Sequence, residues 1–325
     1  MTNHWVITST ESNDPKWFPT YALRMFVGNG KNGWWHFDTP HQPRNFQRVE
    51  SGDMVFLYNS GSREPYHAFM ASAQVGEVCM DGNDWPYTRM SKWFEGRPGR
   101  FGLLLEKPVA FFEPIYLNED LRVDPAGKAL GFKGFFKGPH GGLENLGSGP
   151  GTWEDYPGRS SRRSEFIRRW NSARWNDAKK PAQLGSKGLR EKDIENEIRR
   201  QILRRETAAL NDFCEGEDVL FAVSQVLAYP AERRGAGTKR HKMDLEIGLA
   251  NKEVIVEVKD NAITEEDVSQ LKRYVDGFHR NFPNIPVKGI VAGLGRRVQT
   301  KTQELRYVSA QPYADRLLGL RPSSK

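Results

Sequence analysis

The chain has 325 residues, a formal net charge of +7 and a pI of about 9.3. A chain of this length is expected to form two domains of ordinary size, and its positive charge favours a polyanionic partner. The first residues lack the basic-then-apolar pattern of a signal peptide, and no stretch approaches the roughly 20 apolar residues of a membrane helix. We therefore expect a cytoplasmic protein with no membrane partner.

The first 150 residues are predicted to form short strands. Runs of apolar or alternating residues indicate strands at residues 5–8, 53–58, 69–78 and 102–112. Turns rich in Gly, Asn and Pro separate these runs. Many short strands with few helices predict a small β-barrel or a strongly bent sheet.

The composition changes after Leu146, where two Gly- and Pro-rich loops follow. From residue 159 to residue 192 basic side chains far outnumber acidic ones, and residues 165–170 suit a short helix. This basic segment either follows a phosphate backbone or caps the barrel with Trp170 packed inward. We place the domain boundary near residue 180.

The remaining residues are predicted to alternate helices and strands. The pattern indicates a helix at residues 191–210, a β-hairpin at 244–258, a helix beginning after Thr264, a strand at 285–293 and a terminal helix at 311–318. Cys79 and Cys214 are the two cysteines of the sequence. They provide neither a disulfide framework nor a zinc cluster, so we predict two buried, reduced thiols.

The hairpin carries the most informative group of charges. Its second strand alternates Val254, Val256 and Val258 with Ile255, Glu257 and Lys259, so the last two share one face. Asp244 lies on the first strand, where pairing brings it beside them. Two carboxylates and one ammonium group at one end of a sheet can bind Mg²⁺ through oxygen ligands and leave a lysine to position or deprotonate a water.

The helix after the hairpin adds two polar residues. Thr264 suits the N-cap, and residues 265–267 (EED) place acidic side chains at the positive end of the helix. Gln270 and Tyr274 are four residues apart and therefore lie on one helix face.

Residues 191–278 resemble the PD-(D/E)XK nucleases, most closely the RecB-like domain of the NucS-type DNA endonucleases. The matching pieces are residues 191–194 (EKDI), the Asp244 strand, residues 257–259 (EVK) and residues 270–274 (QLKRY). This resemblance implies a restriction-endonuclease-like α/β core that uses Mg²⁺ or Mn²⁺. It assigns metal binding to Glu191, Asp244 and Glu257, the attacking water to Lys259, and supporting roles to Gln270 and Tyr274. Glu195, one helical turn after Glu191, is an alternative helix ligand.

The first half resembles the EVE family of the PUA-like superfamily, which implies a small β-barrel with a pocket for a single base. The matching motifs are GWWHF at 33–37, PRNF at 43–46, GDMVFLYNS at 52–60, ASAQVGEV at 71–78 and PVAFFEPIYL at 108–117.

A flipped base needs aromatic walls and hydrogen-bonding groups along its edge. The aromatic side chains available are Trp34, Trp35, Phe37 and Tyr58, and the edge-reading ones are Asn45, Asn59 and Ser60. Phosphate contacts are expected from His36, Arg44 and Arg48. Because adjacent strand residues face opposite sides, we expect one of Trp34 and Trp35 to point inward and the other outward.

Together these features predict a two-domain α+β or α/β protein. We expect an EVE-type modified-base-reading domain at residues 1–155, a basic linker at 156–188 and a PD-(D/E)XK nuclease domain at 189–325. The combination indicates a modification-dependent (type IV) restriction endonuclease that flips a modified cytosine and cuts double-stranded DNA, as a homodimer when it cuts. The alternatives are a NucS-type endonuclease that senses mismatched or damaged bases, and a non-catalytic modified nucleic-acid binding protein.

Overall fold

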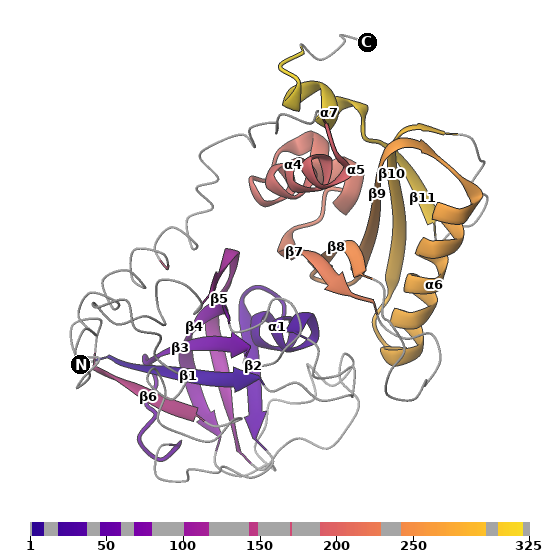
Figure 1. The fold of residues 1–325 in the computed structure, drawn as a ribbon. Coiled ribbons are helices and arrows are strands. Elements are labelled where there is room, and N and C mark those ends of the chain that lie inside the picture. The colour runs from indigo at the N-terminus through magenta and orange to yellow at the C-terminus, as the bar shows by residue number, and fades with distance from the viewer. Residues whose placement is uncertain are drawn as a thin grey trace, which may run out of the picture. The chain divides into compact units, whose positions relative to one another are not determined.

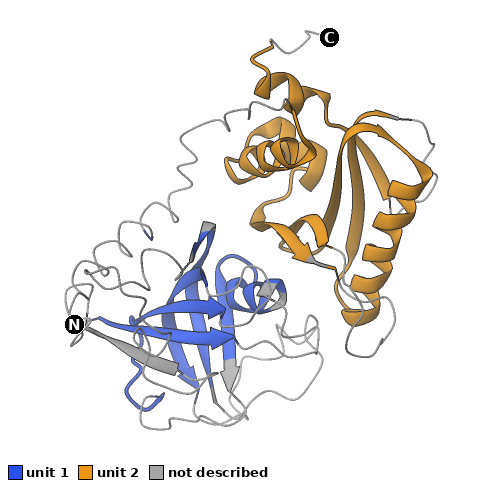
Figure 2. Cartoon of the chain, in the orientation of Figure 1, with its two compact units in different colours: residues 1–177 blue, residues 178–325 orange. Residues whose placement is uncertain are grey.

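The structure of the protein is a computed structural model. It describes residues 2–9, 19–37, 46–59, 68–79, 101–116, 143–148, 170, 189–228, 242–296 and 305–320. The chain forms two compact units, residues 1–177 and residues 178–325 (Figure 2). Predictions for Arg44, Asn45 and Ser60, and for all but the last residue of the 165–170 helix, lie outside the described residues.

The first unit contains a six-stranded sheet and, among the described residues, the helix α1. Its elements are β1 (Asn3–Ser9), α1 (Pro19–Val27), β2 (Asn32–Phe37), β3 (Met54–Asn59), β4 (Ala68–Cys79), β5 (Phe101–Tyr116) and β6 (Leu143–Ser148). The strand order is β2-β5-β4-β3-β1-β6, with β1 and β3 parallel and the other pairs antiparallel (Figure 1). All four strands predicted for this half are present. The helix α1 is an addition to them, and its residues 22–27 are buried.

The sheet of the first unit is bent but open in the part of the chain that the structure describes. Three register shifts interrupt the pairing of β4 with β5, and such bulges bend and twist a long strand pair. The strands β2 and β6 are the two edges, and no described pairing joins them. A strongly bent sheet was one of the two predicted forms, whereas closure into a small barrel is not seen among these strands.

The second unit is a five-stranded sheet with helices on both faces. Its elements are α4 (Glu191–Leu203), α5 (Thr207–Cys214), β7 (Val219–Leu227), β8 (Lys242–Leu249), β9 (Glu253–Ile263), α6 (Glu265–Asn281), β10 (Val287–Arg296), β11 (Leu305–Ser309) and α7 (Gln311–Leu317). The order is β11-β10-β9-β8-β7, antiparallel from β7 to β9 and parallel from β9 to β11. Helices α4, α5 and α7 cover one face and α6 the other (Figure 1). This is the mixed α/β core that the sequence predicts.

Three elements of this unit differ from the prediction. The helix expected at residues 191–210 is divided, because Arg205 adopts a left-handed conformation with φ of 57° between α4 and α5. The strands β7 and β11 were not predicted, and they form the two edges of the sheet.

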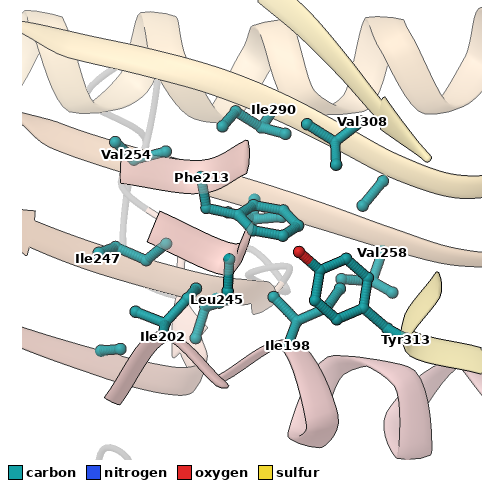
Figure 3. Packing of buried hydrophobic residues seen from close by; sticks show 14 of the residues in the cluster. Ile198, Ile202, Phe213, Leu245, Ile247, Val254, Val258, Ile290, Val308 and Tyr313 are labelled. Atoms are coloured by element: carbon teal, nitrogen blue, oxygen red, sulfur yellow. The ribbon is translucent and has the colours of Figure 1, made fainter. Parts of the chain in front are cut away.

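Strand alternation decides which residues enter the core of the second unit. Val254, Val256 and Val258 of β9 point toward α4, α5 and α7, where they join a buried cluster. Other members of the cluster are Ile198, Ile202, Phe213, Leu245, Ile247, Ile290, Val308 and Tyr313 (Figure 3). Burying each such side chain contributes about 1.5–3 kcal/mol. The intervening Glu257 is therefore directed to the face covered by α6.

Among the described residues, none of the helices has the length and apolar character needed to cross a bilayer. Cys79 and Cys214 are free and buried, as predicted.

Candidate active site

The pairing of β8 with β9 brings two carboxylates together. The pairing ends with Leu245 opposite Val256, and Asp244 and Glu257 directly adjoin that last pair on their own strands. The Oδ2 atom of Asp244 also accepts a hydrogen bond of 2.8 Å from the backbone N–H of Val258. Asp244 is 7% exposed and Glu257 is 1% exposed. Both acids are therefore held below the surface by strand geometry.

Lys259 connects these strands to the helices on either side. Its Nζ atom lies 2.8 Å from Oε1 of Glu257 and 3.5 Å from Oε2 of Glu191, the first residue of α4. Oδ1 of Asp267 in α6 is 4.0 Å away. One ammonium group thus stands among carboxylates from three separate elements.

Helix α6 fixes one oxygen of Glu257. Thr264 caps the helix in a capping box with Asp267, which confirms the predicted N-cap. Gln270 Nε2 donates to Glu257 Oε1 at 2.6 Å and lies 2.8 Å from the hydroxyl of Tyr274. That hydroxyl in turn donates to the carbonyl oxygen of Lys242 at 3.2 Å. The helical spacing of Gln270 and Tyr274 therefore delivers both residues to the site.

The second oxygen of Glu257 is in a different situation. Oε2 is buried and has no hydrogen-bond partner among the described residues. An unsatisfied buried carboxylate oxygen is costly, because it has lost its hydration without replacement. Burial, and then the charge of Asp244, raise the pKa of Glu257 to about 8.

The neighbouring charges respond to the same environment. Burial raises the pKa of Asp244, of Glu191 and of Glu195 above their ordinary values. Burial alone would lower the pKa of Lys259, but the charges of Glu257, Glu191 and Asp244 outweigh it and raise that pKa. A raised pKa keeps Lys259 in its ammonium form at neutral pH, in which it donates hydrogen bonds.

A further residue at the site was not predicted from the sequence. Gln225 of β7 donates from Nε2 to Oε2 of Glu195 at 2.9 Å, and the same nitrogen lies 3.4 Å from Oδ1 of Asp244. Glu195 also accepts a hydrogen bond of 2.8 Å from Lys192. The two candidate helix acids thus have different partners. Glu195 is linked to Asp244 through Gln225, whereas the more exposed Glu191 lies beside Lys259. No local spacing marks Gln225, since its role arises from the pairing of β7 with β8.

The residues fit a divalent cation in part. Among the described residues, no group of three or more His, Cys, Asp or Glu side chains is arranged to hold a metal ion. Asp244 and the unpartnered Oε2 of Glu257 nevertheless provide two hard oxygen donors of the kind that Mg²⁺ prefers. A cation there would compensate the repulsion between the two carboxylates. Glu191 or Glu195 would have to complete the set.

The predicted base-binding residues lie inside the first unit. Trp34 and Trp35 are 2% and 3% exposed, and Tyr58 and Asn59 are also buried. The expectation that one tryptophan faces outward is therefore wrong, because both faces of β2 are covered at this point. Arg48 is exposed, as a phosphate contact requires. The side chains of His36 and Phe37 lie outside the described ones.

Trp170 is the one residue of the basic segment between 159 and 188 that the structure describes. Its ring packs edge-on against Phe56 with centroids 4.9 Å apart, and its Nε1 donates to Oγ of Ser72 at 3.3 Å. Trp170 is therefore packed inward against the sheet of the first unit. The arginines before and after it lie outside the described residues.

Comparison with known proteins supports the assignment of the second unit. Residues 245–309 match the family model of the endonuclease NucS C-terminal domain. This NucS-like segment runs from β8 to β11, and it contains Glu257, Lys259, Gln270 and Tyr274. Asp244 immediately precedes it, whereas α4 and Gln225 lie outside it. No curated protein matches the chain significantly.

Two solved structures are similar over part of the chain. The crystal structure of a repair endonuclease from Pyrococcus abyssi is 18% identical, covers 27% of this chain and 38% of that chain, and has a TM-score of 0.18. The crystal structure of protein VC1899 from Vibrio cholerae is 12% identical, covers 39% of this chain and 31% of that chain, and has a TM-score of 0.25. This chain therefore spans well under half of either protein, and TM-scores this low carry no structural argument.

Proposed function

We propose that the protein is a Mg²⁺-dependent DNA endonuclease whose second unit hydrolyses phosphodiester bonds. One observation carries the proposal. The buried carboxylates of Asp244 and Glu257, one of them with an unpartnered oxygen, stand beside Lys259 on a hairpin that enters the NucS-like segment. Structural charge pairs normally satisfy their oxygens, whereas sites that bind cations leave them available.

Each residue has a task in this proposal. Asp244 and Glu257 hold the cation, which when bound supplies electrostatic stabilisation of the charge that develops on the phosphate. Gln270 fixes Oε1 of Glu257, and Val258 fixes Oδ2 of Asp244, so both carboxylates keep their orientation. Lys259, as an ammonium ion, donates a hydrogen bond to the attacking water or to a phosphate oxygen. It orients these groups and leaves proton removal to another base.

For the first unit we propose the reading of a modified cytosine in DNA. The order of the EVE-like motifs, the aromatic interior of the unit and the net charge of +7 support this role. Because Trp34, Trp35 and Tyr58 are buried, a flipped base must enter the interior of the unit to reach them. Double-strand cutting requires two sites, so we also propose that the enzyme acts as a homodimer.

The second candidate is a repair-type endonuclease that senses mismatched or damaged bases. The match of residues 245–309 to the NucS C-terminal domain favours this candidate, and it concerns the cutting unit alone. Both candidates share the same cleavage chemistry. They differ in which base must be present in the DNA for cleavage to occur.

One experiment tests the function and separates the candidates. The full chain is incubated with Mg²⁺ and matched duplexes that contain cytosine, 5-methylcytosine, 5-hydroxymethylcytosine, glucosylated 5-hydroxymethylcytosine, N6-methyladenine or a mismatch. We expect nicks near modified cytosine that disappear in EDTA. Cutting confined to the mismatched duplex identifies the repair candidate. Absence of cutting on every duplex, at several Mg²⁺ and Mn²⁺ concentrations, overturns the nuclease assignment.

A further inference from the structure

Gln225 occupies a defined place in the sheet of the second unit. The register of β7 with β8 pairs Ser224 with Leu245 and Val226 with Met243, so Gln225 lies opposite Asp244. On the other side of β8, the pairing with β9 ends at Leu245 and Val256, so Asp244 and Glu257 directly adjoin the last pair. Gln225, Asp244 and Glu257 thus come from three neighbouring strands.

The backbone of Gln225 is unusual for a strand. Its φ is 57°, a left-handed conformation that a side chain with a Cβ atom adopts at a cost. Arg205 and Glu215 have similar angles, but they lie at the C-terminal ends of α4 and α5, where a left-handed residue ends a helix. Lys107 in β5 also has a positive φ, of 49°, at a register shift in the pairing of β5 with β4. No helix or turn ends at Gln225, since β7 continues on both sides of it. Such conformations persist where surrounding contacts hold them, often at functional sites.

The contacts of the amide explain what this conformation achieves. The Nε2 group donates to Glu195 Oε2 at 2.9 Å and lies 3.4 Å from Asp244 Oδ1. Glu195 belongs to α4 and Asp244 to β8, and both carboxylates are buried. An amide nitrogen has two hydrogens, so it can serve two acceptors that would otherwise repel each other.

We propose that Gln225 is a positioning residue for the nuclease reaction. Its amide holds Glu195 and Asp244 at a fixed separation and orientation, so that both carboxylates are prepared for the cation before it binds. The role rests on the proposed function of the second unit. It adds a residue outside the NucS-like segment to the machinery, and it ties the first turns of α4 to the central hairpin.

The test uses the full chain and a readout that does not require cleavage. Gln225→Met keeps the length of the side chain and removes both donors. We expect Mn²⁺ binding to the metal-stripped protein, measured by isothermal titration calorimetry, to weaken about 10- to 100-fold, as is usual when a residue that orients metal ligands is lost. The Mg²⁺ concentration that half-saturates cleavage should rise by a similar factor, and cleavage should recover at high Mg²⁺.

A matched control makes the same chemical change elsewhere on the unit. Gln201 of α4 is also buried and donates from Nε2 to Glu197 Oε1 at 2.9 Å. Gln201→Met should bind Mn²⁺ like the wild type. If Gln225→Met does not fold, Gln225→Asn replaces it, because Asn tolerates the left-handed conformation and its shorter side chain cannot span both acids.

The outcomes separate the two proposals. A folded Gln225→Met protein that binds Mn²⁺ and responds to Mg²⁺ like the wild type overturns the positioning role and leaves the nuclease function intact. Equal weakening in the Gln201→Met control also overturns it, because the effect would then be general. A wild-type protein that binds Mn²⁺ but cuts no DNA overturns the proposed function, while weaker Mn²⁺ binding by Gln225→Met still supports the positioning of the two acids.

Discussion

Asp53 in the first unit and Glu257 in the second are both buried acids, yet they are satisfied to very different degrees. Asp53 accepts hydrogen bonds from the backbone N–H of Asn3 at 2.8 Å, Nε1 of Trp5 at 2.7 Å and the backbone N–H of Glu50 at 3.0 Å. Both of its oxygens are used, and it ties β1 to the turn before β3. Glu257 receives two donors on one oxygen and none on the other among the described residues. Burial of an acid is therefore compatible with a structural role, whereas an unsatisfied oxygen beside further charges indicates a site.

The largest stability effect should come from the aromatic interior of the first unit. Trp35→Ala removes a buried ring and should lower the free energy of unfolding by about 3–5 kcal/mol. All nine tryptophans of the chain lie at or before residue 175, so tryptophan fluorescence follows the unfolding of the first unit. Arg48→Ala, at an exposed position, is the control and should unfold like the wild type. A Trp35→Ala protein of normal stability that no longer distinguishes modified DNA would instead make Trp35 a wall of the base pocket.

The largest effect on activity should come from Lys259. Lys259→Ala removes the ammonium group that serves the reacting atoms, and we expect cleavage to fall about 10²- to 10³-fold, as on the loss of one transition-state donor. Lys288→Ala is the matched control. This exposed lysine lies away from the site, and its Nζ atom is 2.6 Å from Oε1 of Glu215. Surface pairs contribute little, so the control should cut normally. Equal activity of Lys259→Ala and the wild type in a single-turnover assay would remove Lys259 from the mechanism.

The contrast between the two buried acids predicts opposite changes in stability. Asp53→Asn replaces one acceptor oxygen with an NH2 group that faces hydrogen-bond donors. It should lower the free energy of unfolding of the first unit by about 1–3 kcal/mol. Glu257→Gln keeps an acceptor for Lys259 and Gln270. Above pH 8, where Glu257 is ionised, it also removes the repulsion with Asp244, so the second unit should gain stability there in EDTA while cleavage is lost. Urea unfolding monitored by tryptophan fluorescence and by far-UV circular dichroism measures both effects. A destabilised Glu257→Gln protein beside an unchanged Asp53→Asn protein would reverse the comparison.

The sequence predicted the parts of the site that depend on local spacing. Alternation along β9 placed Glu257 and Lys259 on one face, helical periodicity paired Gln270 with Tyr274, and Thr264 marked the start of α6. Gln225 could not be predicted, because its role depends on strand pairing across 19 residues and on a left-handed backbone. The choice between Glu191 and Glu195 depends on how α4 packs.

The prediction for Trp34 and Trp35 failed for a related reason. Alternation tells which face of a strand a side chain takes, but it does not tell whether that face is covered. The burial of both rings is a property of the packed unit. Closure of the sheet likewise depends on long-range pairing of its edges, and local patterns do not encode it.

The pH dependence of unfolding should differ in sign between the two units. In the second unit, burial raises the pKa of Glu257 to about 8 and also raises those of Asp244, Glu191 and Glu195. Between their ordinary values and the raised ones the folded state holds more protons than the unfolded state, so stability in EDTA should fall as the pH rises from 5 to 8. Each such group contributes at most about 1.4 kcal/mol per pH unit. The raised pKa of Lys259 acts above its ordinary value of 10.5, outside this window.

In the first unit the sign is reversed. Burial, opposed by the charge of Asp53, lowers the pKa of His4 below its ordinary 6.5. The unfolded state then holds more protons below that value, so this unit should gain stability as the pH rises toward 6.5 and change little above it.

Tryptophan fluorescence reports on the first unit, and far-UV circular dichroism also reports on the helices of the second. Glu257→Gln should flatten the dependence of stability on pH that circular dichroism follows, and leave the one that fluorescence follows unchanged. Mn²⁺ should restore the stability of the wild-type second unit at pH 8, because a cation bound by the folded state shifts the equilibrium toward it. Parallel profiles for the two units, unaffected by Mn²⁺, would show that the acids at Asp244 and Glu257 are as well satisfied as Asp53.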